Sequence, residues 1–184
     1  MKATQQLKDE QEGITLMLNI METISNDLEK GKELNINQFE RILEFIKGFA
    51  DKCHHGKEED ILFPALIVHG MSKDGGPIAV MLYEHQLGRS HIKELSLAFE
   101  EFKKGNKQAL KIIIASSRNY IELLRNHIEK ENNILFMMAD KVLNEAEQIK
   151  IFDSFEKLEV EKIGIGKHEE FHELLKELRR IYLQ

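Results

Sequence analysis

A ten-residue phrase that occurs twice constrains the fold of this chain more than any other feature of its sequence. Residues 54–63 read HHGKEEDILF and residues 127–136 read HIEKENNILF, so both fit the pattern H-x-x-K-E-x-x-I-L-F. A histidine and a glutamate four residues later lie on the same face of a helix, one turn apart. The repeat therefore predicts two similar helices, one carrying His54 and Glu58 and the other carrying His127 and Glu131.

The rest of the chain also shows the apolar spacing of amphipathic helices, with steps of three, four and seven residues. The spacing predicts helices over about residues 4–30, 37–68, 77–103, 107–142, 145–162 and 168–183. The first and third of these align at nearly the same offset as the two phrases, which places Gln11 opposite His85. We expect an all-α fold in which a duplicated αα-hairpin forms an up-down four-helix bundle, followed by two C-terminal helices.

Length and composition narrow the class of protein. We expect residues 1–184 to form one domain, with a core bundle over about residues 4–143 and a helical extension over about residues 145–184. The net charge is −6 and both signs are mixed along the chain, which argues against a nucleic-acid partner. No stretch approaches the roughly 20 apolar residues that span a bilayer. The N-terminus lacks the apolar run of a signal peptide, and the single cysteine, Cys53, cannot form an intrachain disulfide. These features favour a cytoplasmic protein without a membrane partner.

Polar residues interrupt the apolar stripe near the middle of each core helix. They are Gln11 on the first, His54 and Glu58 on the second, His85 on the third, and His127 and Glu131 on the fourth. Burying two carboxylates in one small bundle is unfavourable unless a cation lies between them. Imidazole and carboxylate together suit iron, manganese or zinc, and two bridging carboxylates suit a pair of metals. A single His–Glu pair is usually a surface pair, but two matching pairs on apolar stripes favour a metal site.

These motifs give the chain a resemblance to the hemerythrin-like proteins with an HHE cation-binding domain, whose pattern is H … HxxxE … H … HxxxE. The order differs from the Glu-x-x-His of ferritin-like proteins. The phrases KEEDILFPAL, EHQLGR, HIEKENNILF and GKHEEFH are close to the family's form, and the resemblance covers essentially the whole chain. It implies a four-helix bundle around a non-haem di-iron site. It also implies binding of dioxygen or nitric oxide, sensing of oxygen or iron, or modest peroxidase activity.

Two residues depart from the family's pattern. Gln11 stands where the family has a histidine, and Met137 stands where the second LFP motif has its proline. Loss of a nitrogen donor at Gln11 implies that one metal is held more loosely, or that a coordination position is open to water or substrate. His168 and His172, four residues apart on the last helix, are further candidate ligands that could cap the open end of the bundle; a solvated pair is the alternative.

His55 and Glu59 lie one residue after the ligand pair, about 100° around an α-helix. We therefore expect them around the rim of the site, outside the set of primary ligands.

The sequence leaves three functions open. The first is a small-molecule binding or sensing protein, in which a di-iron centre takes dioxygen or nitric oxide, with His54, His85 and His127 as terminal ligands and Glu58 and Glu131 as bridges. The second is an enzyme, such as a peroxidase acting on peroxide at the same centre. The third is storage or structural use of a metal, with zinc or manganese as alternatives to iron.

Overall fold

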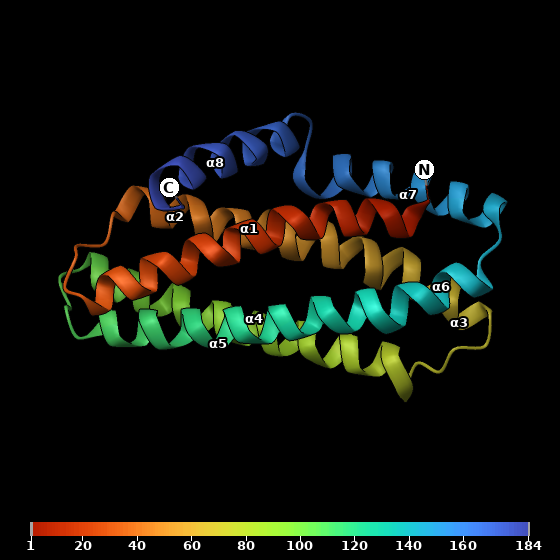
Figure 1. Ribbon diagram of the computed structural model, residues 1–184, viewed down its shortest axis with the longest axis horizontal. Coiled ribbons are helices and arrows are strands. Elements are labelled where there is room, and N and C mark those ends of the chain that lie inside the picture. The colour runs from red at the N-terminus through yellow and green to blue at the C-terminus, as the bar shows by residue number, and fades with distance from the viewer. Residues whose placement is uncertain (1, 184) are drawn as a thin grey trace.

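Four long helical stretches run alternately up and down and enclose a common interior (Figure 1). The structure, a computed structural model, describes residues 2–183. The first stretch is α1 (Ala3–Glu29), and the third is α4 (Gly76–Lys103). The second comprises α2 (Ile36–Phe45), two π-helical segments, η1 (Ile46–His55) and η2 (Glu58–Leu62), and α3 (Phe63–Val68). The fourth comprises α5 (Ala109–Lys130), the π-helical segment η3 (Glu131–Leu135) and α6 (Phe136–Val142).

The predicted all-α, up-down bundle with two extra C-terminal helices is confirmed. Among the described residues, 2–183, there is no β-strand. The first helix ends as expected at Gly31, whose φ of 83° is the left-handed conformation that glycine adopts without strain. Pro77 lies in the first turn of α4, where its missing N–H leaves no helical hydrogen bond unmade. None of the helices between residues 2 and 183 is long and apolar enough to cross a membrane.

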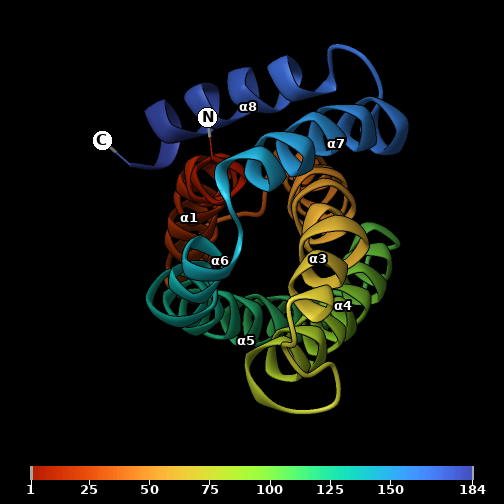
Figure 2. The same cartoon turned by 90° about the vertical axis from the view of Figure 1, so that its right-hand side faces the viewer.

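The two C-terminal helices lie on the outside of the bundle. α7 (Glu145–Ile163) and α8 (Lys167–Tyr182) follow one another along the length of the bundle (Figure 1), and Figure 2 shows that both lie outside the four stretches. α7 packs against η1 and α1, and α8 packs against α1. A Cβ atom at Gly48 would lie 2.9 Å from the ring of Phe171, so glycine at this position lets α8 approach the second stretch closely.

The internal duplication extends to the backbone. η2 begins at Glu58 and η3 begins at Glu131, so both copies of the repeated phrase pass into a π-helical turn at their glutamate. Such turns close hydrogen bonds between residues five apart and are frequent at functional sites. The longer segment η1 has no equivalent in the second copy, where the corresponding residues lie within α5. The two halves are therefore similar but not identical around the interior.

The polar layer of the bundle lies between two apolar clusters. One contains Ile14, Phe45, Leu95 and Tyr120, and the other contains Leu7, Leu62, Met81 and Leu135, each with further neighbours. Along α1 the second cluster ends at Leu7 and the first begins at Ile14, with Gln11 between them. Charged groups in this layer are therefore removed from water on both sides, which makes their pairing decisive for stability.

Candidate metal centre

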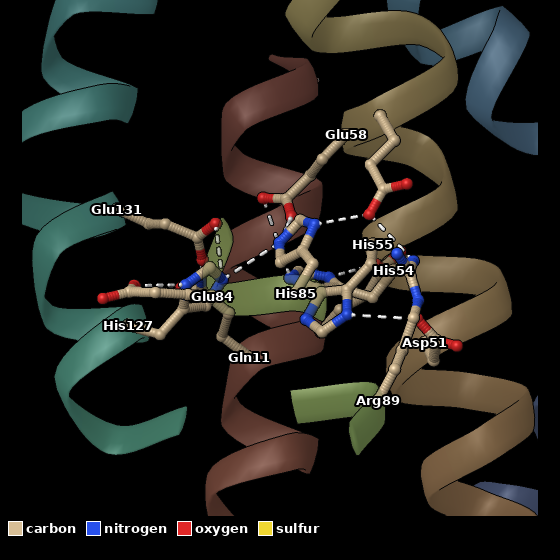
Figure 3. Close-up of polar contacts among 12 residues, drawn as sticks. Gln11, Asp51, His54, His55, Glu58, Glu84, His85, Arg89, His127 and Glu131 are labelled. Atoms are coloured by element: carbon tan, nitrogen blue, oxygen red, sulfur yellow. Dashed lines mark hydrogen bonds and ion pairs between the residues drawn. The ribbon is translucent and has the colours of Figure 1, made fainter. Parts of the chain in front are cut away.

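The structure brings all six predicted core residues together in the middle of the bundle (Figure 3). They are Gln11, His54, Glu58, His85, His127 and Glu131, and each is at most 2% exposed. They come from all four helical stretches, as the duplicated hairpin predicted.

Two groups of side chains in this cluster could each hold a cation. One consists of His55, Glu58, His85 and His127, and the other of His54, Glu58 and Glu131. Within each group, one ligand atom from every member lies within 4.8 Å of the others. Glu58 belongs to both groups. Its Oε2 lies 3.3 Å from His85 Nε2, whereas its Oε1 lies 3.9 Å from His54 Nε2.

The structure corrects the expectation that His55 lies at the rim. Its side chain is 3% exposed, and its ring stacks on that of His85 with centroids 3.9 Å apart. Neither ring nitrogen has a hydrogen-bond partner; the nearest carboxylate oxygen, on Asp51, is 3.4 Å from Nδ1. His55 closes η1, and a π-helix holds more residues per turn than an α-helix, so neighbouring side chains are separated by a smaller angle. Two adjacent histidines can then both face the interior.

Glu59 lies beside the cluster, as expected. Its Oε1 is 2.6 Å from His85 Nδ1 and also accepts a hydrogen bond of 2.8 Å from Arg89. The Arg89 guanidinium contacts Asp51 as well, so one cation holds the two carboxylates beside His55 and His85. With Nδ1 of His85 donating to Glu59, the lone pair of His85 is on Nε2, which points into the cluster.

The two central carboxyl groups have opposite pKa shifts, because only Glu131 lies beside a charged partner. Burial, with the nearby Glu131, raises the pKa of Glu58 well above its ordinary value. Burial also raises that of Glu131, but the charge and hydrogen bond of His127, 3.0 Å away, lower it more, so its pKa falls below the ordinary value. Although burial lowers the pKa of His127, its carboxylate partners raise it to about 9. Without a cation, these shifts favour the neutral form of Glu58 and an ion pair between Glu131 and His127.

Several buried polar atoms in the cluster have no partner within the protein. They are both oxygens of Glu58, Oε1 of Gln11 and both nitrogens of His55. Buried polar groups are nearly always hydrogen-bonded. Several oxygen and nitrogen atoms without a hydrogen-bond partner in one place therefore indicate a ligand that binds them. Oxygen and imidazole nitrogen atoms in this number fit one or two first-row transition metals. The residues present therefore fit the metal that the sequence predicted.

Gln11 has a more definite role than the sequence could give it. Its Nε2 donates a hydrogen bond of 2.7 Å to Glu131 Oε2. This contact orients the carboxylate toward the cluster and leaves the amide oxygen of Gln11 buried without a partner. A histidine at this position would give the group with His54 a second nitrogen ligand. Glutamine instead provides an N–H that donates to Glu131 and a carbonyl oxygen.

Two of the histidines contact Glu–Lys ion pairs that the sequence did not lead us to expect. His54 Nδ1 lies 2.9 Å from Glu10, which also contacts Lys57 Nζ at 2.5 Å. In the second copy, His127 Nδ1 lies 2.9 Å from Glu84, which also pairs with Lys130. Both carboxylates fix the ring orientation and direct Nε2 toward the interior.

The signal for these pairs was present in the repeat. Lysine is one of its invariant letters, and the alignment that matches Gln11 to His85 also matches Glu10 to Glu84. Because the glutamate and the lysine recur at the same offset as the ligands, their ion pair could have been predicted to contact the ligand histidines.

The two supporting lysines differ in burial because of α7. Lys57 is completely buried and makes a second ion pair of 2.7 Å with Glu159 of α7. The side chain of Lys130 is 38% exposed, and Glu84 is its one ion-pair partner within residues 2–183. Helix α7 thus covers the Glu10–Lys57 pair, whereas the Glu84–Lys130 pair lies at the surface.

The structure does not bring His168 and His172 to the metal-binding cluster. Both lie on the outer surface, on α8, where His168 Nδ1 is 2.7 Å from Glu159 Oε1. Their link to the interior is indirect, through Glu159, Lys57 and Glu10.

The ion pair between Glu159 and His168 should make stability depend on pH. Burial raises the pKa of Glu159, but His168 and Lys57 lower it more, to about 2 from 4.5, while Glu159 raises the pKa of His168 above 6.5. The contribution of Glu159 to the free energy of unfolding is present above pH 4.5 and is lost as the pH falls toward 2. The contribution of His168 is present below pH 6.5 and is lost as the pH rises through the pKa of His168 in the folded protein. Calorimetry in the presence of a chelator should therefore show the largest loss of Tm for His168→Gln between pH 4.5 and 6.5. A loss that does not change with pH would contradict this assignment.

With the fold and the cluster established, comparison with known protein families gives a clear result. The model of the hemerythrin HHE cation-binding domain matches residues 2–139, and the chain belongs to this family. Comparison with curated proteins and with solved structures gave no match. The matched region ends before α7, so α7, which covers Lys57, and α8 lie outside it.

Proposed function

We propose that this protein binds two iron ions in the middle of the bundle and uses them to bind or sense dioxygen or a related small molecule such as nitric oxide. His55, His85 and His127 would hold one ion, and His54 and Glu131 the other, with Glu58 shared between them. Bound iron would supply the redox and ligand-binding chemistry. The cytoplasmic location expected from the sequence is part of the same proposal.

The observation that carries this proposal is the position of Glu58 between two groups of donors. One oxygen is directed to His85 and the other to His54, so a single carboxylate spans both groups. A bridging carboxylate favours two ions over one, and the protonated state of Glu58 in the absence of metal gives a proton that metal binding would displace. Glu131 was also expected to bridge. It belongs to the group with His54, its Oε1 lies 3.0 Å from His127 Nε2, and its Oε2 accepts a hydrogen bond from Gln11.

The two ions would have different environments. The group with His55 offers three nitrogens and one carboxylate, whereas the group with His54 offers one nitrogen and two carboxylates, with the amide oxygen of Gln11 nearby. Imidazole nitrogens suit iron, whereas carboxylate and carbonyl oxygens suit manganese and magnesium, so the group with His55 is the better match to iron. We therefore infer one tightly held ion and one loosely held ion.

A pocket of about 420 Å³ provides the approach for a small molecule. It opens between η1 and α4, and its inner wall includes His55, His85 and the buried Tyr120. Apolar residues such as Ile46 and Ile92 line much of the rest, which suits dioxygen and nitric oxide. Arg89, fixed by Asp51 and Glu59, lies on the same wall.

Reconstitution with ferrous iron tests the proposed function. Anaerobic addition of iron should load about two ions per chain, as two donor groups imply, and exposure to air or nitric oxide should produce a charge-transfer band. The matched control is Glu131→Gln, which keeps the volume of the side chain and removes a ligand charge. A colourless protein after loading with two iron ions would contradict small-molecule binding. If the purified protein instead carries a metal other than iron and shows no spectral change in air, storage or structural use is favoured.

The size of the pocket also favours a second candidate, reduction of peroxides. A volume of 420 Å³ is far larger than dioxygen requires and could admit an organic hydroperoxide. Turnover of peroxide by the iron-loaded protein with an added electron donor, and its loss in Glu131→Ala, would support this activity. No measurable turnover would remove it.

A further inference from the structure

A second cluster of metal-ligating side chains lies on the surface of α8, outside the bundle. His168 and His172 are four residues apart, and their Nε2 atoms are 2.9 Å from each other. The rings are 4.6 Å apart between centroids, and both pack beside Phe49, which limits their rotation. Without a metal, the two Nε2 atoms are within hydrogen-bond distance of each other, so two imidazole nitrogens are held close together at the surface.

The carboxylate of Glu159 selects the form of His168 that can bind a cation. It lies 2.7 Å from Nδ1, so this nitrogen carries the proton and donates to it. The lone pair of neutral His168 is then on Nε2, the atom that faces His172. A carboxylate bound to the outer nitrogen of a ligating histidine is the usual arrangement in protein metal sites, because it fixes both the tautomer and the ring.

The spacing of the two nitrogens indicates the geometry of the ion. Metal–imidazole bonds are about 2.0–2.1 Å long, so nitrogens 2.9 Å apart subtend an angle of about 90° at a shared ion. Tetragonal Cu²⁺ and Ni²⁺ have angles of this size between neighbouring ligands, whereas tetrahedral Zn²⁺ requires a wider one. The distance between the two Nε2 atoms thus matches that of neighbouring ligands on a tetragonal ion.

We propose that His168 and His172 form a separate surface site for one divalent transition-metal ion, with Cu²⁺ or Ni²⁺ preferred over Zn²⁺. Water would complete the coordination on the exposed side. Glu159 acts as a positioning residue for this site, and it also pairs with Lys57, whose other partner is the Glu10 carboxylate behind His54. The site does not depend on the metal content of the bundle interior.

The test is a Cu²⁺ titration of the full-length chain followed by equilibrium dialysis, mass spectrometry and electron paramagnetic resonance. His172→Ala removes one ligand of the surface pair, and His91→Ala, which changes a histidine of α4 outside both clusters, is the matched control. Any copper that enters the bundle is common to all three proteins, so the difference between them isolates the surface site. The wild-type protein and His91→Ala should each bind one more Cu²⁺ than His172→Ala, with nitrogen hyperfine structure from two imidazoles.

Glu159→Gln supplies a second readout. It should keep the extra equivalent but weaken it by about 10–100-fold, the range typical for loss of a carboxylate behind a ligating histidine. Equal copper content and affinity in the wild-type protein and His172→Ala would overturn the proposed site. Unchanged affinity in Glu159→Gln would overturn the positioning role.

Discussion

Replacing Glu58 with glutamine should weaken binding of both metal ions, yet leave the metal-free protein at least as stable as the wild type. The carboxylate reaches both donor groups, so its loss removes a ligand from each. In the absence of metal, its folded pKa lies well above the ordinary 4.5, so above pH 4.5 the protein bears a cost to keep this group neutral. A neutral amide of the same size avoids that cost. Metal titration and denaturant unfolding of the chelated protein measure the two effects separately.

The matched variant Glu131→Gln should behave differently in the absence of metal. Glu131 is ionised and lies 3.0 Å from His127, whose pKa is raised to about 9. Removing one partner of a buried ion pair typically costs about 3–5 kcal/mol. Because Glu84 remains beside His127, we expect a loss near the lower end of this range. If Glu58→Gln destabilises the chelated protein as much as Glu131→Gln does, the assignment of the proton to Glu58 is wrong.

The second large effect concerns the two lysines of the repeated phrase. Lys57→Met should lower the free energy of unfolding by about 3–5 kcal/mol, because Lys57 is completely buried and its loss leaves the Glu10 and Glu159 carboxylates without their shared cation. Lys130→Met should cost less than about 1 kcal/mol, because the side chain of Lys130 is 38% exposed and water can replace it beside Glu84. Chemical denaturation of both variants measures the difference.

A conservative control separates charge from packing at this position. Lys57→Arg keeps the positive charge, so it should retain more stability than Lys57→Met. Equal losses in Lys57→Met and Lys130→Met would show that α7 does not seal the first half of the site, contrary to the contact between Lys57 and Glu159.

Much of this centre could be predicted because its residues repeat at a fixed offset. The phrase containing His54 and Glu58 recurs with His127 and Glu131, and one offset for the partner helices adds Gln11 and His85. Helical periodicity alone was sufficient to place these residues inside an up-down bundle, because each lies on an apolar stripe that must be buried. The fold followed from the same periodicity.

The remaining features depend on geometry that side-chain spacing does not encode. His55 joins the cluster because η1 is wound as a π-helix, and the rule of 100° per residue fails there. Lys57 is buried, and Lys130 partly exposed, because α7 packs across one half of the bundle. Such packing between distant segments cannot be read from the repeat, in which both lysines stand directly before the glutamate of the His–Glu pair.

Anomalous diffraction from iron-loaded crystals tests the central claim most directly. Data at the iron edge should show two peaks inside the bundle, one beside His55, His85 and His127 and one beside His54 and Glu131. Glu58 should lie between them, and the peak beside His54 should have the lower occupancy at limiting iron. A single peak, or a second ion that does not contact Glu58, would contradict a shared carboxylate between two unequal metal sites.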